Sequence, residues 1–253
     1  MTAPSSDARL AARLAQQAGE LLLGMRPGDL FGKDLSDAGD SASNAFLLRE
    51  LAAHRPNDAV LSEESADSPA RLSSDRVWII DPLDGSREFG MPGRADWAVH
   101  VALWQAGRDI TDAAVAQPAL DAVYASDDGP PAVPPSRRVI LVSDSRPPPF
   151  AADVAAAVGA ELEPMGSAGA KAMAVLRGEA AAYLHAGGQW EWDSAAPVGV
   201  VRAAGLHASR IDGTPLRYNS AHPYLPDLLI CAPDLAAELL AAIAVHHGQI
   251  HLK

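Results

Sequence analysis

Residues 77–89 read VWIIDPLDGSREF, and this stretch decides both the fold class and the kind of site that the chain can carry. The apolar run 77–80 predicts a buried strand that stops at Asp81. Pro82 supplies no backbone N–H, and Asp84-Gly85 is a turn signal. Two carboxylates three residues apart at a strand end can converge on one point. Clustered Asp and Glu oxygens without His or Cys suit a hard cation such as Mg²⁺, and the alternative is a solvated turn.

Composition limits the classes of protein that need to be considered. The 253 residues are enough for one large domain or two closely packed subdomains, and 48% of them are hydrophobic. A formal net charge of −12 argues against a long nucleic-acid partner. The single cysteine, Cys231, excludes an intrachain disulfide. No apolar run approaches the about 20 residues of a membrane span, and the N-terminus lacks the pattern of a signal peptide. We therefore expect a cytoplasmic protein that binds neither nucleic acid nor membrane.

Helical and strand patterns are mixed along the whole chain. Apolar spacing predicts helices at 10–25, 43–54, 151–158, 168–177, 194–204 and 235–246. Strands are predicted at 77–81, 98–104, 113–117, 121–125, 139–142, 181–184 and 228–231. The Pro-rich stretch 126–138, SDDGPPAVPPSRR, is the best boundary between two subdomains, 1–130 and 136–253. Helices and strands in both halves predict layered α and β packing.

Four further segments stand in a fixed order around the Asp-Pro-Leu-Asp-Gly-Ser motif. They are DAGD at 37–40, the Glu63-Glu64 pair in LSEES, GSAGAK at 166–171 and WEWDSAA at 190–196. This order resembles the inositol-monophosphatase superfamily of Mg²⁺-dependent, lithium-sensitive phosphatases. The SREF stretch at 86–89 resembles the variant found in 3′-phosphoadenosine 5′-phosphate (PAP) phosphatases, and the chain is similar to the CysQ-type enzymes of actinobacteria.

The resemblance covers nearly the whole chain and carries expectations about fold and assembly. It implies an α/β (α+β) fold, the five-layer αβαβα sandwich of the inositol monophosphatase/fructose-1,6-bisphosphatase superfamily. The N-terminal subdomain would carry most metal ligands, and the C-terminal subdomain would complete the metal site and the substrate pocket. Relatives are commonly homodimers, so we expect a homodimer.

The resemblance also implies a set of metal ligands. Two or three Mg²⁺ ions would be bound by four carboxylates and one backbone carbonyl: Glu63, Asp81, Leu83 (its C=O), Asp84 and Asp193. Two metals about 3.5–4 Å apart can stabilise both the entering and the leaving oxygen of a phosphate monoester, and Asp81 is the natural bridge. For Asp193 the alternative is a helix N-cap before Ser194.

Three residues are expected to act in catalysis: Asp40, Ser86 and Glu64. The resemblance implies that Asp40 and Ser86 orient the attacking water, and that Glu64 holds an outer-sphere water. This chain has Ser86 where many relatives have Thr, which keeps the hydroxyl, and Asp37 where many have Thr. The alternative for Asp40 is an N-cap of the 43–54 helix, and for Glu64 a solvated surface acid.

Substrate contacts are expected on both sides of the metal site: Gly85, Ser86, Arg87, Ser167, Lys171 and His185. Backbone N–H groups at a helix start attract phosphate, which suits residues 85–87. The resemblance places Ser167, Lys171 and His185 near the second phosphate and the nucleotide. The alternatives are a solvent-facing helix lysine at 171, a hydrogen-bonded strand-end histidine at 185, and a pair of exposed charges at Arg87 and Glu88 that do not face each other.

These expectations together predict a Mg²⁺-dependent phosphomonoesterase. It would remove the 3′-phosphate of PAP, and of its sulfated form PAPS, to give AMP (from PAP) and phosphate, in a role linked to sulfate assimilation. Inositol 1-monophosphate and fructose 1,6-bisphosphate are the rival substrates, so the partner is a small phosphorylated nucleotide or sugar. A catalytically silent metal or nucleotide sensor is the alternative of another class, and it would need a broken carboxylate set.

Overall fold

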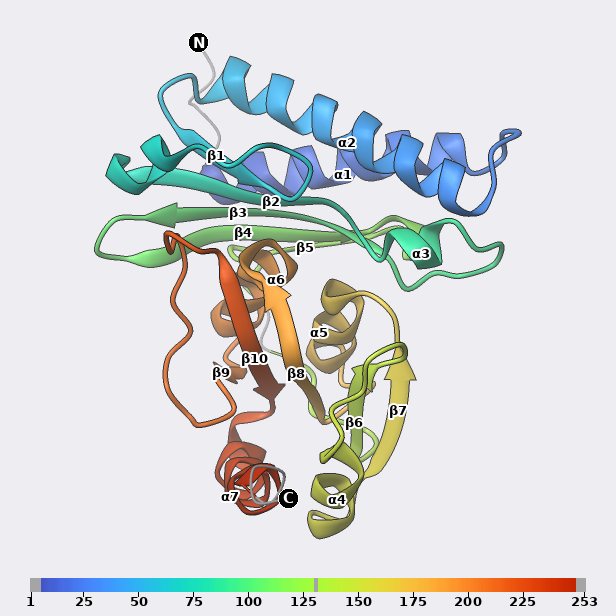
Figure 1. The fold of residues 1–253 in the computed structure, drawn as a ribbon, viewed down its shortest axis with the longest axis vertical. Helices are drawn as coiled ribbons and strands as arrows, with labels where there is room; N and C mark the ends of the chain where they lie inside the picture. The colour runs from blue at the N-terminus through green and yellow to red at the C-terminus, as the bar shows by residue number, and fades with distance from the viewer. Residues whose placement is uncertain (1–5, 130–131, 249–253) are drawn as a thin grey trace.

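Two five-stranded sheets alternate with three layers of helices in the computed structural model (Figure 1). The structure describes residues 6–129 and 132–248. The prediction that the N-terminus has no signal peptide falls partly on residues outside the described part of the chain. Residues 130–131 of the Pro-rich stretch also lie outside it.

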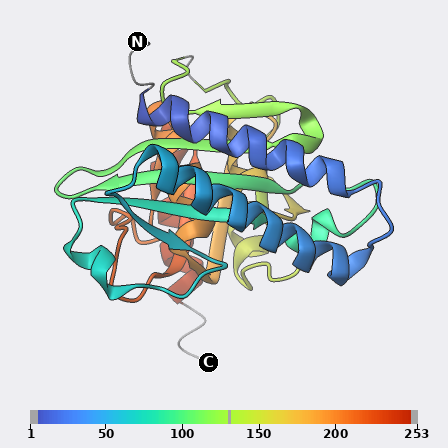
Figure 2. The same ribbon diagram turned by 90° about the horizontal axis from the view of Figure 1, so that it is seen from above.

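The first sheet comes from the part of the chain before the Pro-rich stretch. Its strands in spatial order are β1 (Ala59–Ser62), β2 (Arg76–Asp84), β3 (Ala98–Gln105), β4 (Asp109–Gln117) and β5 (Ala122–Ala125). β1 runs parallel to β2, and the other neighbours are antiparallel. Helices α1 (Asp7–Met25) and α2 (Gly32–His54) lie side by side across its outer face, and the short α3 (Ser86–Phe89) follows β2 (Figure 2).

The second sheet has the spatial order β7-β6-β8-β10-β9. Its strands are β6 (Val139–Ser143), β7 (Glu161–Met165), β8 (Ala182–Trp190), β9 (His207–Ser209) and β10 (Tyr224–Cys231). β6 is parallel to β7 and β8, whereas β10 is antiparallel to β8 and β9. The helices of this half are α4 (Ala151–Ala157), α5 (Ala168–Leu176), α6 (Glu191–Ala203) and α7 (Ala236–Gly248).

Strand β2 explains why the layers stack as they do. Successive side chains of a strand point to opposite faces of the sheet. Trp78 and Ile80 pack into the cluster formed with α1 and α2, while Val77 and Ile79 pack into the cluster formed with α5 and α6. Because both faces are covered, the strand is a continuous apolar run rather than an alternating one.

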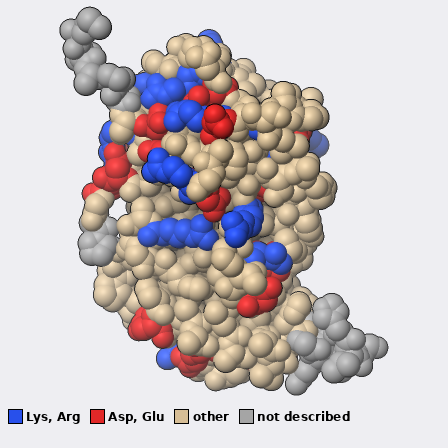
Figure 3. Space-filling view, turned by 90° about the vertical axis from the view of Figure 1, so that its left-hand side faces the viewer, with Lys and Arg blue, Asp and Glu red and all other residues tan. Residues whose placement is uncertain are grey.

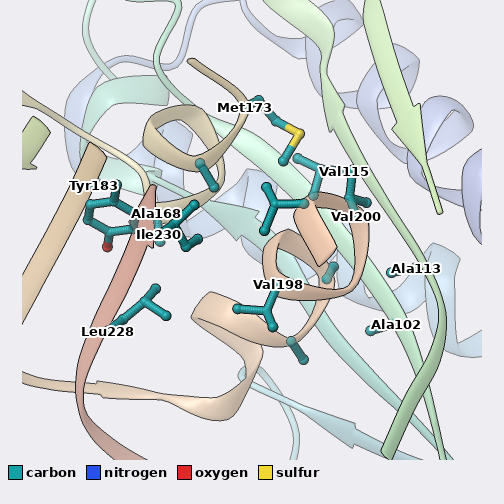
Figure 4. Packing of buried hydrophobic residues seen from close by; sticks show 14 of the residues in the cluster. Ala102, Ala113, Val115, Ala168, Met173, Tyr183, Val198, Val200, Leu228 and Ile230 are labelled. Atoms are coloured by element: carbon teal, nitrogen blue, oxygen red, sulfur yellow. The ribbon is translucent and has the colours of Figure 1, made fainter. Parts of the chain in front are cut away.

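The central helices α5 and α6 lie between the two sheets and share one core with both (Figure 4). Helices α4 and α7 pack with Leu229 and Cys231 of β10 on the outer face of the second sheet. The layers therefore run αβαβα, and the fold prediction is confirmed. The division into subdomains 1–130 and 136–253 stays a prediction.

Three helices begin earlier than predicted: α1 at Asp7 rather than at residue 10, and also α2 and α6, where the shift changes the interpretation of a site residue. α2 begins at Gly32 rather than at residue 43, so Asp40 lies inside the helix and the N-cap alternative is wrong. The segment DAGD resembles a turn because of Gly39, but a Cβ there would meet Phe89 at 2.8 Å and Leu22 at 3.1 Å. Gly39 is thus required by close packing, which outweighs its cost of about 1 kcal/mol in a helix.

α6 begins at Glu191, which places Asp193 in the first turn of the helix rather than at its N-cap. The Asp193 carboxylate still accepts a hydrogen bond from the Trp190 N–H at 2.5 Å. Asp193 therefore stabilises the start of α6 with one oxygen and keeps the other for a ligand.

Charged side chains of both signs share the face drawn in Figure 3, and much of that face carries neither. Within residues 6–129 and 132–248, no helix combines the length and apolar character that a membrane-crossing segment needs.

Candidate active site

A bulge in β2 brings the two aspartates of the motif to the same side of the sheet. β2 and β3 pair Asp81 with His100 and Asp84 with Ala98, so β2 has one residue more than β3 between these pairs. In a regular strand, residues three apart would face opposite sides. A bulge re-aims side chains, and here it makes Asp81 and Asp84 converge. Gly85 then turns the chain with φ +87°, a conformation that favours glycine.

Asp84 is held from the other half of the chain. Its Oδ2 accepts hydrogen bonds from the Ser167 hydroxyl at 2.5 Å and from the Gly169 N–H at 2.7 Å, both at the start of α5. His100 Nε2 lies 3.2 Å from the same oxygen. Since all three contacts use Oδ2, the Oδ1 atom remains for a further ligand.

Asp193 completes a group of three carboxylates. One oxygen each of Asp81, Asp84 and Asp193 lies within 4.8 Å of the others. Asp81 and Asp84 are buried, and Asp81 Oδ1 also accepts the Leu83 N–H at 3.0 Å. The three side chains come from β2 and α6, so both halves build the cluster.

Glu63, Asp40 and Ser86 surround this cluster. Glu63 follows β1 and is hydrogen-bonded to Asp81, although much of the residue is exposed. The Ser86 hydroxyl lies 3.3 Å from Asp40 Oδ1 and 3.1 Å from the Leu83 carbonyl, and it can donate to either. Glu64 is exposed and lies further out, beside Asp40.

The carboxylates raise one another's pKa values. Burial, together with the charge of Glu64, raises the pKa of Asp40 to about 7. Desolvation of the Glu63 carboxylate in the crowded site, with the charges of Asp193 and Asp40, raises its pKa to about 8. Burial and the Asp84 charge raise the pKa of Asp193 to about 6, and burial and Glu63 raise that of Asp81.

Asp84 is the exception in this group. Burial alone acts to raise its pKa, but His100, by its charge and its contact, and the Ser167 hydrogen bond lower it to about 2. Four acids with raised pKa values surround one that stays ionised, so the positive charges of His100 and Lys171 compensate the carboxylates of this site only in part. Oxygen-only donors in this arrangement fit a hard divalent cation, and the triad of aspartates can hold a metal ion.

A cleft of about 280 Å³ extends from the cluster between the two halves. Its walls include all six predicted substrate residues: Gly85, Ser86, Arg87, Ser167, Lys171 and His185. The structure thus brings them together beside Asp84 and Asp193. Their roles toward a substrate stay predictions.

Lys171 is not a solvent-facing helix residue. It is 3% exposed, and its ammonium donates to the carbonyls of Met165, Gly166 and Ser167 at 3.3, 2.9 and 2.7 Å. Burial lowers its pKa to about 8. The solvent-facing alternative is therefore wrong, and the buried cation fixes the turn that places Ser167 on Asp84.

His185 and Arg87 are also engaged within the protein. His185 is buried in β8, and its Nε2 donates to the Gly188 carbonyl at 3.1 Å, as the structural alternative predicts. Arg87 contacts Glu88 at 2.8 Å through Nε and also pairs with Asp144. The alternative of two charges that do not face each other is therefore wrong, and Arg87 links α3 to the end of β6.

Among the residues of this site that sequence reasoning missed are His100 and Gln189. His100 stands in an apolar run of β3 directly opposite Asp81, and its Nδ1 donates to the Trp192 carbonyl at 3.1 Å. A lone polar residue in the run AVHVAL was the available signal. Gln189 lines the cleft from β8, and nothing in the residue pattern singles it out.

An αβαβα sandwich with a carboxylate cluster at the bulged end of a strand, opening into a polar cleft between the sheets, defines a class of metal-binding phosphoester hydrolases. The chain belongs to the inositol monophosphatase family, whose model matches residues 5–249. The resemblance inferred from the sequence is therefore confirmed.

Individual relatives agree with this assignment. The chain is 56% identical over 239 residues to a 3′-phosphoadenosine 5′-phosphate phosphatase of Mycobacterium tuberculosis, covering 90% of this chain and 89% of the relative. It is 30% identical over 235 residues to the 3′(2′),5′-bisphosphate nucleotidase CysQ of Escherichia coli, covering 84% and 94%. The fold is similar to that of inositol monophosphatase II from Staphylococcus aureus, with TM-score 0.78 and 21% identity over 92% of this chain and 93% of that one.

Proposed function

We propose that this protein is a Mg²⁺-dependent phosphomonoesterase that hydrolyses the 3′-phosphate of PAP to give AMP and phosphate. The observation that carries the proposal is the convergence of Asp81, Asp84 and Asp193 within 4.8 Å at the head of a polar cleft. Relatives at 54–56% identity that are named PAP phosphatases support the choice of substrate.

Glu63, Asp81, Asp84, Asp193 and the Leu83 carbonyl would hold two or three Mg²⁺ ions. Bound there, the ions supply positive charge that activates water and stabilises the charge on the transferred phosphoryl group. The Ser86 hydroxyl lies within reach of both the Leu83 carbonyl and Asp40, so it would donate to Asp40 alone once the carbonyl takes up another partner.

Asp40 and Ser86 form the proton-handling pair in this proposal. The hydroxyl donates to Asp40 and keeps its oxygen lone pairs for a water. Burial raises the pKa of Asp40 to about 7 in the metal-free protein, and a carboxylate buried in this way can accept a proton through the Ser86 hydroxyl. Glu64, next along the same rim, would hold an outer-sphere water.

The rest of the cleft would bind the nucleotide and its second phosphate. Gly85, Ser86 and Arg87 would contact the reacting phosphate, and Ser167, Lys171 and His185, which line the same cleft, would face the rest of the substrate. Lys171 then acts on the ligand mainly through the positive potential of a buried cation. PAPS fits the same description, because it shares the 3′-phosphate, and both molecules connect the protein to sulfate assimilation.

The decisive experiment measures phosphate release from PAP, inositol 1-phosphate and fructose 1,6-bisphosphate at equal concentration with Mg²⁺. We expect PAP to give the highest kcat/KM. A preference for inositol 1-phosphate or fructose 1,6-bisphosphate would transfer the function to that substrate. Failure to hydrolyse any of the three while binding Mg²⁺ and AMP would support a silent sensor.

We further propose a cytoplasmic homodimer that binds neither nucleic acid nor membrane. The single cysteine, Cys231, is buried and forms no disulfide, so the protein does not depend on an oxidising compartment. The net charge of −12 disfavours binding to a polyanion such as nucleic acid. Cell fractionation and light scattering test these two points.

A further inference from the structure

One polar side chain of the cleft has no partner in the protein. Gln189 is 5% exposed, lies next to the last residue of β8 and lines the cleft together with Asp84 and Asp193. Its Nε2 atom is buried and has no hydrogen-bond partner among residues 6–129 and 132–248. Buried polar groups without a partner are rare in folded proteins and call for an explanation.

The backbone around Gln189 is built to aim this side chain. β8 and β10 pair Ala186 with Asp227 and Gln189 with Leu225, so β8 carries one residue more in this interval. Gly187 and Gly188, with φ values of +115° and +89°, form this bulge. A Cβ at Gly188 would overlap the Tyr224 ring, and the Gly188 carbonyl accepts the hydrogen bond from His185. A bulge that re-aims a side chain next to an active site is a selected feature rather than a defect.

The chemistry of the amide restricts what it can bind. Two other donors of the cleft are already used: Lys171 bonds three carbonyls, and Ser167 bonds Asp84. An uncharged N–H donor beside a group of carboxylates suits a neutral acceptor rather than a phosphate, which the cations of the site attract. On the nucleoside part of a nucleotide, the acceptors of this kind that extend outward from the sugar ring are the ribose 2′-hydroxyl oxygen and the unprotonated ring nitrogens of the base.

We propose that Gln189 is a specificity residue that donates a hydrogen bond to a neutral acceptor on the nucleoside of the substrate. This inference rests on the proposed function, since it takes the ligand to be a nucleotide. The unpaired amide costs stability in the free protein, and the bound nucleoside supplies the missing partner. A ligand without that acceptor leaves the amide unpaired, which is how a polar site rejects analogues.

The test uses Gln189→Met, which keeps the length of the side chain and removes both donors. The substrates are PAP, 2′-deoxyadenosine 3′,5′-bisphosphate and the abasic 1-O-methylribose 3,5-bisphosphate. We expect the variant to raise KM for PAP about tenfold, as for one hydrogen bond, with kcat within about twofold. For the analogue that lacks the acceptor, wild type and variant should give the same KM. The deoxy analogue identifies the ribose hydroxyl as the partner, and the abasic analogue identifies the base.

Two controls separate this role from a structural one. Gln189→Met should melt at the same or a higher temperature than the wild type, because it removes an unpaired buried donor. Gln105→Met makes the same change at the far end of β3, where the amide donates to Thr111 at 2.9 Å, and should leave KM unchanged. Equal losses on all three substrates, an unchanged KM for PAP, or a lower melting temperature for Gln189→Met would overturn the proposal.

The proposal can fail separately from the proposed function. If the wild type releases no phosphate from PAP, the function fails, but calorimetric titration with AMP still tests Gln189 because binding needs no turnover. About tenfold weaker AMP binding in Gln189→Met supports the proposal. Equal binding, or no binding of AMP to the wild type, refutes it.

Discussion

Replacing Asp40 by Asn should make the metal-free protein more stable while it abolishes activity. Asp40 is 9% exposed, and burial with the Glu64 charge raises its pKa from the ordinary value of 3.8 to about 7. At about 1.4 kcal/mol per pH unit, the ionised carboxylate costs the folded state roughly 4 kcal/mol at pH 8, as an upper limit. Asn keeps an oxygen for the Ser86 hydroxyl and carries no charge.

The effect should depend on pH with a definite sign. The folded protein keeps the Asp40 proton up to about pH 7, whereas the unfolded chain loses it near pH 4. Between these values the folded state binds more protons, so the free energy of unfolding falls as pH rises. The cost that Asn removes is therefore roughly 2 kcal/mol at pH 5 and roughly 4 kcal/mol at pH 8.

Urea unfolding in excess EDTA at pH 5 and pH 8 measures both values. Asp37→Asn is a matched control, because Asp37 lies one turn earlier on α2, is exposed and pairs only with Lys33 among the described residues. It should change stability by less than about 0.5 kcal/mol at either pH. Destabilisation by Asp40→Asn at pH 8, or the same effect at both pH values, would refute the reasoning.

The remaining predictions concern metals, assembly and substrate. Activity should need Mg²⁺ and disappear with chelator, and full activity in EDTA would contradict this. Asp84→Asn should lower kcat by at least about 10², because only the NH₂ group of Asn would face the metals. The fold should be kept, because the Asn oxygen can still accept hydrogen bonds from Ser167 and Gly169. Li⁺ resembles Mg²⁺ in size but has half its charge, so it should inhibit in an uncompetitive manner, whereas equal rates in Li⁺ and Na⁺ would count against a two-metal site. Light scattering at micromolar concentration should give a dimer mass, and a monomer mass would refute it. Lys171→Ala should reduce kcat/KM for both PAP and inositol 1-phosphate, because Lys171 fixes the turn that holds Ser167 on Asp84, and the loss should be larger for PAP, whose second phosphate also loses a nearby positive charge. Equal losses would make Lys171 purely structural.

The residue pattern predicted layered α and β packing and the convergence of Asp81 with Asp84, because those depend on local rules. The order αβαβα and the ligand Asp193 came from the family resemblance. A continuous apolar run marks a strand buried on both faces, and the motif ends that run with two carboxylates. The pattern failed where a neighbour distant in sequence decides the outcome. The helix was predicted to begin only after Gly39, because Phe89 and Leu22, which require a small residue there, lie elsewhere in the chain.

The same limit applies within the site. Lys171 could not be recognised as buried, since the three carbonyls that satisfy it become visible only when the turn before α5 is built. His100 could be placed beside Asp84 only from the register of β2 and β3, which a bulge shifts by one residue. Periodicity carries no information about such a shift.

The anchoring of Asp84 has a consequence for how ligands exchange. Asp84 belongs to the first sheet, yet Ser167 and Gly169, which precede the second half's strand β8, hold its carboxylate. The Asp84 carboxylate is thus both a candidate metal ligand and a contact between the two halves. A separation of the two halves would break these hydrogen bonds and disturb the candidate metal site in every catalytic cycle. We therefore expect substrate to enter and product to leave through the open side of the cleft, without separation of the two halves.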